Sequence, residues 1–419
     1  MLERGRFLAY STIIVVLALL VREYYVLVSQ VVNPYGGDPR EYITYAQNLM
    51  HGVFSKSASS PTPDAYRTPG YPAFLALSML WEGDWYPRLL QMQVVLGTLT
   101  VVGVIGLARQ WLAPGWALLA GALMALWPHH IAATSEILSE VLFGFVLVGA
   151  LWLTALALNR RSMAFSVGAG AAYGVAYLVN PIIALFPLVV AAVVCRERLV
   201  KHGVALALVA MLGVIGWSAR SAHIGADGSE RAYINLVQGS WPLYQLAYVS
   251  RNADPEPARI IQAIGEESTL LVADHAAGFR ALRERIAREP GTYARWYLGK
   301  PFLLWDWDIR IGEGDVYVHP VHKSPLQTHP MLRAVTSVLK AANPWIFVIS
   351  LTFALYAAWR APPTVRLVAL AFLYVTAIHT LLQAEPRYAV AYRPLQMLLF
   401  AAALSWSWER YRLRFPRRP

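Results

Sequence analysis

The sequence predicts an all-α integral membrane protein, built as a bundle of about ten transmembrane helices. Hydrophobic residues make up 57% of the 419 residues, charged residues only 15%, and the mean hydropathy is +0.43. Soluble domains carry about 25% charged residues. The apolar residues also form separate runs, and a run of about 20 residues is enough to cross a bilayer. Composition and run length therefore favour a membrane protein over a soluble one.

The candidate spans follow one another along the chain. They are residues 7–31, 88–108, 113–131, 136–158, 163–180, 181–195, 202–220, 333–358, 364–383 and 388–408. The sixth is short, and with the fifth it could form one helix broken at Asn180-Pro181. The first could be mistaken for a signal peptide. No Ala-x-Ala-like cleavage site follows it, so we expect an uncleaved span.

Basic residues predict the orientation. If all ten segments cross, one side receives Arg4, Arg6, Arg109, Arg160, Arg161, Arg196, Arg198, Lys201, Arg360, Arg366, Arg410, Arg412, Arg414, Arg417 and Arg418. By the positive-inside rule that side is cytoplasmic. We therefore expect an N-terminal membrane region (1–220) with an outer loop at 32–87. An outer subdomain (221–332) and a C-terminal membrane region with a basic tail (333–419) follow.

The formal net charge of +11 does not predict a nucleic-acid partner. The basic residues lie in short loops between apolar runs, where contact with anionic membrane lipids explains them. Cys195 is the only cysteine, which excludes an intrachain disulfide and a Cys/His zinc site. His275, His319, His322 and His329 show no metal-ligand spacing, so we predict no metal site.

Asp38 is the first candidate for chemistry. It is the first acidic residue beyond the outer end of the first span, where a carboxylate could take a proton from an acceptor hydroxyl. The structural alternative is helix capping by Asp38, with Pro39 and Glu41 in the first turn. The two roles are compatible. Tyr42 and Tyr45 would lie near one face of this helix and could contact substrate.

A second polar segment, Tyr66-Arg-Thr-Pro-Gly-Tyr-Pro72, predicts a rigid turn. Arg67 could bind phosphate through its planar fork, or the turn could serve only for re-entry into the membrane. Tyr71 is a candidate substrate contact, and Lys56 is a second cationic candidate in the same loop.

Two acidic residues, Glu136 and Glu140, lie one helical turn apart at the outer start of the fourth span. Acidic residues are favoured by the dipole at a helix N-terminus, which is the structural explanation, with Ser135 or Thr134 as the cap. A carboxylate so close to lipid is costly, so both are also candidate substrate ligands.

The last span opens with Glu385-Pro-Arg387-Tyr388 and Arg393. Positive residues on the outer side run against the positive-inside trend, so Arg387 and Arg393 are candidates for a donor phosphate, with Tyr388 beside them. A salt bridge between Arg387 and Glu385 is the structural alternative.

Other aromatic and charged positions carry weaker expectations. In the 221–332 loop we expect an aromatic interfacial helix whose Trp305 and Trp307 shape an acceptor site. In the first span, Arg22 and Glu23 could form an ion pair.

These motifs resemble those of the bacterial GT-C glycosyltransferases, relatives of the protein O-mannosyltransferases and the lipid A aminoarabinose transferase. The likeness rests on Gly37-Asp38-x-x-x-Tyr42 through Gly52-x-Phe54 and on Arg67-Thr-Pro-Gly-Tyr-Pro72. Ser139-Glu140, Gly174 to Pro181 and Glu385-Pro-Arg-Tyr388 with Pro394 add to it. The likeness covers about residues 7–220 and 333–408.

The resemblance implies a GT-C-like bundle with amphipathic helices in the first outer loop. It also implies transfer of a sugar from a polyprenyl-phosphate donor to a lipid, glycan or protein acceptor, with Asp38 catalytic. Many relatives have a second acidic residue where this chain has Pro39, and Arg-Pro where it has Asn180-Pro181. These departures leave the donor and the metal requirement open.

The function predicted is therefore a membrane glycosyltransferase of the bacterial inner membrane, with its site on the outer face and no cofactor. A glycan polymerase or ligase, or a transporter or flippase of a lipid-linked sugar, remains as an alternative. The notable charges cluster at outer helix ends, whereas a transporter favours ionisable residues at mid-membrane and repeated halves.

Overall fold

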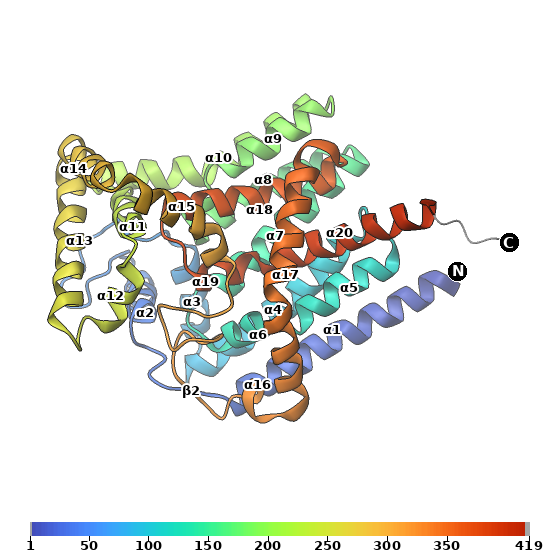
Figure 1. Cartoon of the computed structure of the whole chain (residues 1–419), viewed down its shortest axis with the longest axis horizontal. Coiled ribbons are helices and arrows are strands. Elements are labelled where there is room, and N and C mark those ends of the chain that lie inside the picture. Colours follow the sequence, from blue (N-terminus) through green and yellow to red (C-terminus); the bar gives the residue numbers. More distant parts are fainter. Residues whose placement is uncertain (1, 415–419) are drawn as a thin grey trace.

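The computed structural model describes residues 2–414, which are helical almost throughout (Figure 1). The N-terminal membrane region and its outer loop contain, in order, α1 Leu2–Val28, β1 Gln30–Val31, α2 Asp38–Met50, α3 Gly70–Met79, α4 Trp85–Ala108, α5 Pro114–Ala125, α6 Pro128–Ala132, η1 Ala133–Ser135, α7 Glu140–Arg160, α8 Met163–Val179, η2 Pro181–Ile183, α9 Phe186–Arg196 and α10 Val200–His223.

The outer loop that follows α10 is also helical. It contains α11 Glu230–Ser240, α12 Tyr244–Ser250, α13 Pro255–Ala273, α14 His275–Arg288, α15 Pro290–Leu304, β2 Val321–His322 and α16 Pro325–Thr328. The C-terminal membrane region contains α17 Pro330–Arg360, α18 Pro363–Leu381, α19 Pro386–Ala389, η3 Val390–Tyr392 and α20 Arg393–Arg414.

The all-α membrane architecture confirms the predicted fold class, but the predicted number of spans is not reproduced. Among the described residues, 6 helices are long and apolar enough to cross a membrane. A further span results if α5 is counted together with residues 128–135, although the chain bends by 54° between them. The helices α8 and α9 are apolar but shorter. The fourth predicted span begins at Glu140 rather than at residue 136.

Arg22 explains how the bend after α5 is stabilised. A helix leaves its last carbonyls without partners. The Arg22 guanidinium, which is fully buried, donates to the carbonyls of Met124 (3.2 Å) and Ala125 (3.0 Å) and contacts His130 Nδ1 at 3.1 Å. The expected ion pair with Glu23 is therefore wrong, because Arg22 is used to satisfy backbone at a broken helix.

The basic clusters that were expected to share one side lie at one end of the bundle. The Arg109 guanidinium lies 5.2 Å from the ring centroid of Phe7, and His202 Nε2 lies 3.1 Å from the carbonyl oxygen of Arg161. Figure 1 shows the start of α1 and the end of α20 at this end and the helices α2 and α11–α14 at the opposite end. Residues 415–419, part of the basic tail, lie outside the described residues.

Hydrophobic packing underlies this arrangement, and two of the clusters found among residues 2–414 separate the membrane helices from the outer ones. The larger one runs through the membrane helices. The smaller one lies among α11, α12 and α13 and contains Val237, Tyr244, Ile264 and Leu271. The outer helices thus have a small hydrophobic core of their own.

The two tryptophans expected to shape an acceptor site, Trp305 and Trp307, are buried, so this part of the expectation for residues 295–307 is wrong. Trp305 and Trp307 are 1% and 3% exposed. The Trp305 ring stacks on Phe372 at 4.4 Å, and Trp307 lies edge-on to His129 at 4.7 Å. Both indoles belong to the core between the outer loop and the membrane helices, so neither is free to shape an acceptor site.

Candidate active site

Asp38 is the first residue of α2, and the N-cap position belongs to Gly37. Gly37 has φ of 70°, in the left-handed region that glycine adopts at little cost, and no side chain caps the helix. The interpretation of Asp38 as an N-cap is therefore wrong. Its carboxylate is left available for tertiary contacts, and 31% of the side chain is exposed.

Two arginines from distant parts of the chain hold the Asp38 carboxylate. Arg67 Nη2 lies 2.6 Å from Oδ1, and Arg387 Nη2 lies 2.7 Å from Oδ2. Their side chains are only 3% and 13% exposed. Charge-assisted bonds of this length are among the stronger polar contacts in proteins. Asp38 is thus the centre of a buried cation–anion–cation cluster that opens to solvent on one side.

The position of Arg67 is fixed by close packing of the turn that follows it against α8. A Cβ on Gly70 would lie 2.6 Å from the backbone of Leu178, so only glycine lets the start of α3 approach the end of α8 this closely. The guanidinium also donates to Glu41 Oε2 at 2.6 Å through Nε and lies 4.3 Å from the centre of the Tyr42 ring. Its Nη1 is buried and has no hydrogen-bond partner among the described residues.

Arg387 lies in α19, the short helix before α20. Its Nε donates to Glu140 Oε1 at 3.1 Å, at the first turn of α7. The other Glu140 oxygen is buried and without a partner among residues 2–414. The expected alternative, a salt bridge to Glu385, is wrong. Glu385 instead accepts from Gln245 Nε2 at 2.8 Å and from the backbone amides of residues 310 and 311.

These charges determine the ionisation of Asp38. Burial by itself would raise its pKa, but the guanidiniums of Arg387 and Arg67, with Arg231 in addition, hold the pKa well below its usual range. Asp38 is therefore a carboxylate at any physiological pH. Within residues 2–414, no group of three His, Cys, Asp or Glu side chains could hold a metal ion.

Three predicted tyrosines lie around this cluster. The Tyr42 ring lies under the Arg67 guanidinium, and the Tyr71 ring packs edge-on against the Tyr42 ring, with 4.7 Å between the ring centroids. Tyr388 donates its hydroxyl to Gln383 at 2.8 Å and stacks on His379 at 5.2 Å. The first two support the arginine, while Tyr388 lies next to Arg387 in the chain.

Other predicted residues lie elsewhere. Tyr45 is fully buried and hydrogen-bonds Asp64, and Lys56 is exposed with its ammonium 4.4 Å from the Tyr66 ring. Glu136 pairs with His319, and the other ring nitrogen of His319 contacts the carbonyl oxygen of Gly36, two residues before Asp38. Tyr45 and Lys56 belong to the first outer loop, and within residues 2–414 neither they nor Glu136 form a hydrogen bond or ion pair with Asp38.

Arg393 is not brought to the cluster. It is fully buried and donates to Asn343 Oδ1 at 3.0 Å, Gln396 Oε1 at 2.8 Å and the carbonyl of Asp306 at 2.7 Å. These contacts join α17 and α20 to the end of the outer loop. The geometry gives Arg393 a structural role rather than the predicted contact with a donor phosphate.

Two residues of the 221–332 loop take part in the site although the sequence did not single them out. The positive charge of Arg231 in α11 lowers the Asp38 pKa, and its guanidinium lies 5.8 Å from the Tyr66 ring. Tyr244 in α12 is close enough for the Asp38 charge to raise its own pKa further than burial alone does. Neither residue carries a local motif, so no sequence signal could have found them.

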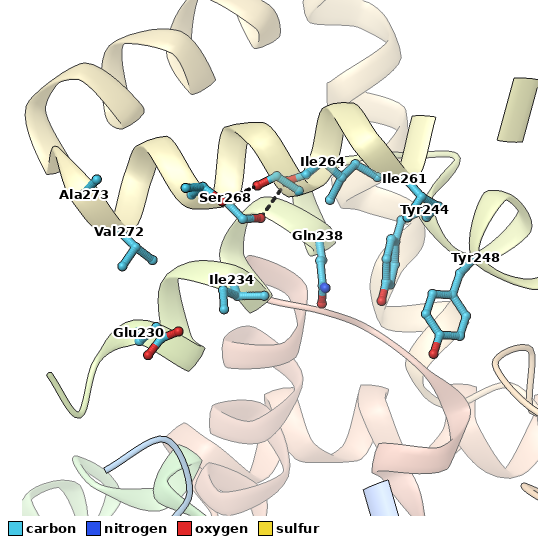
Figure 2. A pocket seen from close by; sticks show the side chains of 12 residues that line it. Glu230, Ile234, Gln238, Tyr244, Tyr248, Ile261, Ile264, Ser268, Val272 and Ala273 are labelled. Atoms are coloured by element: carbon cyan, nitrogen blue, oxygen red, sulfur yellow. Dashed lines mark hydrogen bonds between the residues drawn. The ribbon is translucent and has the colours of Figure 1, made fainter. Parts of the chain in front are cut away.

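A groove of about 450 Å³ lies between α11, α12 and α13 (Figure 2). Figure 2 shows Gln238 and Tyr244 side by side on one wall, with Tyr248 at one end and Glu230 toward the other. Tyr244 belongs both to this groove and to the surroundings of Asp38. The next residue, Gln245, binds the backbone at Ala384 at 2.7 Å, which fixes α12 against the segment leading to Arg387.

The fold is that of a multi-pass membrane protein, and it is similar to solved structures of membrane oligosaccharyltransferases. No family model matches the sequence, and no curated protein matches it. The apo oligosaccharyltransferase of Archaeoglobus fulgidus is similar over 97% of this chain and 51% of its own, with 16% identity and a TM-score of 0.53. The same organism's AglB, in complex with an inhibitory peptide and a dolichol-phosphate, is similar over 98% of this chain and 51% of its own, with 16% identity and a TM-score of 0.51.

ArnT from Cupriavidus metallidurans bound to undecaprenyl phosphate is also similar. It matches over 98% of this chain and 62% of its own, with 14% identity and a TM-score of 0.43. This chain thus spans about half the length of the oligosaccharyltransferase chains. At these identities the likeness concerns the fold alone, and the two oligosaccharyltransferase structures, whose TM-scores exceed 0.5, confirm the GT-C-like fold expected from the motifs.

Proposed function

We propose that the protein is a membrane glycosyltransferase that moves a sugar from a polyprenyl-phosphate donor to an envelope acceptor. The observation that carries this proposal is the partly exposed Asp38 carboxylate held between Arg67 and Arg387. A general base beside two guanidiniums is what the reaction needs, since one partner loses a proton and the other leaves as a phosphate.

The arginines would bind the donor phosphate. Arg presents several N–H donors in a planar fork that matches phosphate oxygens. Arg67 Nη1 is buried and has no hydrogen-bond partner among residues 2–414, so a small shift of the guanidinium toward a phosphate would give this nitrogen a partner while Nη2 keeps its bond to Asp38. During transfer, the bond between the anomeric carbon and the phosphate oxygen breaks, and both electrons go to the phosphate. The guanidiniums stabilise this developing negative charge.

Asp38 would receive the acceptor's proton. The new bond joins the acceptor oxygen to the anomeric carbon, and the hydroxyl proton moves to a carboxylate oxygen. With its pKa held well below the usual range, Asp38 is a weak base in the structure described. A phosphate that draws the guanidiniums toward itself would weaken their hold on Asp38. The base would then become stronger only when donor is bound.

The acceptor would approach from the side of the outer helices. The groove of α11, α12 and α13 has apolar walls interrupted by Gln238 and Glu230, and Tyr244 lies beside Gln238 in one wall. Aromatic and amide groups in one wall suit a lipid, glycan or protein acceptor that carries a hydroxyl, which is the range the resemblance implies.

Transfer of labelled sugar tests this function. Purified protein in nanodiscs would receive polyprenyl-phosphate-linked hexoses and pentoses together with an envelope extract. We expect labelled product and free polyprenyl phosphate, both absent with Asp38→Asn. Transfer of whole oligosaccharides but not single sugars would favour the polymerase or ligase alternative. Movement of labelled lipid between leaflets without any product would contradict the enzyme and favour a flippase.

We also propose that the site faces away from the cytoplasm, in a bacterial inner membrane. The support is that the basic clusters gather at the end opposite α2 and α11–α14. After Cys195→Ser, single cysteines at Ser57 and Gly228 should react with a membrane-impermeant thiol reagent added outside intact cells, and one at Ser162 should not. The reverse pattern would place the site on the cytoplasmic face.

A further inference from the structure

A histidine that the proposed chemistry does not use lies beside the segment that carries Asp38. The strand β2 pairs antiparallel with β1, with Val321 opposite Val31, and Val32 donates to the carbonyl of Pro320 at 2.7 Å. This pairing brings His319 from the second outer loop against the first. The imidazole is 14% exposed there, and the Glu136 side chain is 4% exposed.

Both nitrogens of the His319 ring face oxygen atoms that can only accept. Nδ1 pairs with a carboxylate oxygen of Glu136, and Nε2 lies 3.3 Å from the carbonyl oxygen of Gly36. A neutral imidazole has one N–H and one acceptor nitrogen, so it can satisfy only one of these two partners. An imidazolium donates from both nitrogens. The bridge between Glu136 and Gly36 is therefore complete only when His319 is protonated.

His319 contacts the backbone at a pair of glycines, Gly36 and Gly37, that can act as a hinge. Gly36 and Gly37 immediately precede Asp38, and Gly37 lies in the left-handed region with φ of 70°. Two successive glycines have the largest backbone freedom of any pair. Tertiary contacts must therefore fix where Asp38 begins α2, and His319 supplies one from outside the loop.

Charged and aromatic groups from several elements surround His319 and Glu136. Glu136 lies before α7, and Arg387 of α19 opposes protonation of the ring. Tyr25 of α1, Tyr71 of α3 and Tyr86 of α4 lie near Glu136, and Tyr317, from the same loop as His319, lies near Tyr25. Burial by itself would lower the His319 pKa, but the hydrogen bond and charge of Glu136, with the Gly36 carbonyl, raise it above its usual value.

We propose that His319, as an imidazolium, is a positioning residue that fixes the Gly36–Gly37 hinge, and that loss of its proton releases Asp38 and switches transfer off as pH rises. This inference rests on the proposed function for its consequence on transfer. Its structural part, a hinge held by a protonated bridge, does not.

The sign of the effect follows from which form makes the bridge. The protonated form dominates below the raised pKa and is lost as pH rises through it. Asp38 is ionised throughout the accessible range and adds no acid limb near neutrality. The transfer rate should therefore be level on the acid side and fall on the alkaline side. Where one proton is required, the fall approaches tenfold per pH unit.

The test compares pH profiles of kcat and donor KM in nanodiscs. Wild type should show the alkaline fall in kcat. His319→Gln should have a lower kcat with no such fall and an unchanged donor KM, because the phosphate-binding arginines stay in place. Glu136→Gln keeps the shape of the side chain but removes the negative charge that favours the imidazolium. The alkaline fall in kcat of this variant should therefore occur at lower pH than in wild type. His322→Gln is the matched control, since His322 is exposed in the same segment and should match wild type.

Hydrogen exchange of the peptide covering residues 33–41 gives a second measurement that needs no transfer. After correction for intrinsic rates, exchange in wild type should increase between pH 6 and pH 9, and His319→Gln should exchange at the faster rate at both values. An alkaline fall retained by His319→Gln, or exchange that is the same in both proteins, would overturn the proposal. If no transfer is found at all, the proposed function fails while the exchange result still decides the hinge.

Discussion

The two outer loops differ in what their sequences disclose. Residues 32–87 carry compact polar patterns, and these predicted both Asp38 and Arg67, which the structure joins at 2.6 Å. Residues 221–332 carry no such pattern, yet they supply Arg231, Tyr244 and His319 to the same surroundings. A short loop must place its functional groups by local sequence, whereas a helical subdomain places them by packing. Packing leaves little trace in the spacing of residues.

The largest effect that can break this comparison is expected at Asp38. Asp38→Asn should lower the transfer rate by about 10²–10⁴, the usual cost of losing a general base. It should also leave donor phosphate binding intact or tighter, because both guanidiniums lose a competing carboxylate. The measurements are single-turnover transfer and polyprenyl-phosphate affinity in nanodiscs.

Asp84→Asn is the matched control for this substitution. Asp84 lies in the same outer loop and caps α4 by accepting from the Tyr86 amide at 3.0 Å, which Asn also does. Its transfer rate should equal that of wild type. A structural role for Asp38 predicts a different result, in which donor binding and transfer are lost together with thermal stability.

A smaller effect is expected at Arg387, which tests the class of donor. Charge-assisted hydrogen bonds are worth about 1.5–3 kcal/mol, so Arg387→Ala should weaken binding of polyprenyl-phosphate by about 10- to 100-fold. Arg387→Lys keeps the positive charge but loses the planar fork of N–H donors, so its affinity for polyprenyl-phosphate should lie between those of wild type and Arg387→Ala. Arg310→Lys serves as control, since this exposed arginine forms an ion pair with Asp306, and within residues 2–414 it forms none with Asp38. Equal affinity in all four proteins would remove Arg387 from the donor site.

The sequence predicted the fold class and the residues whose polarity conflicts with their place in a membrane. Asp38, Arg67, Glu140 and Arg387 are polar groups at outer helix ends, and the structure brings these four together. The same criterion failed for Arg393. A buried guanidinium that satisfies side chains and carbonyls looks the same in sequence as one that binds phosphate.

Other parts of the structure could not have been predicted for different physical reasons. The helix count failed because Pro128 and Pro181 break apolar runs, and hydropathy does not distinguish a bent span from two short helices. The cap interpretation of Asp38 failed because Gly37 takes the cap position and the carboxylate is used in tertiary contacts. Glu136 and His319 lie 183 residues apart, so only the pairing of β1 with β2 relates them.

The smallest effect separates the two loops most sharply, because it concerns a residue that only the structure identified. Arg231 is half-buried, and its charge helps to hold down the pKa of Asp38. Arg231→Ala should raise that pKa and change the transfer rate by about a factor of five or less, since the attraction between partly exposed charges is worth about 0–1 kcal/mol. Arg283→Ala is the control, because Arg283 is exposed on α14 of the same subdomain. If the rate changes with Arg231→Ala and not with the control, the second loop acts on Asp38 through charge. Identical rates in the two variants would limit that loop to binding acceptor and positioning the hinge.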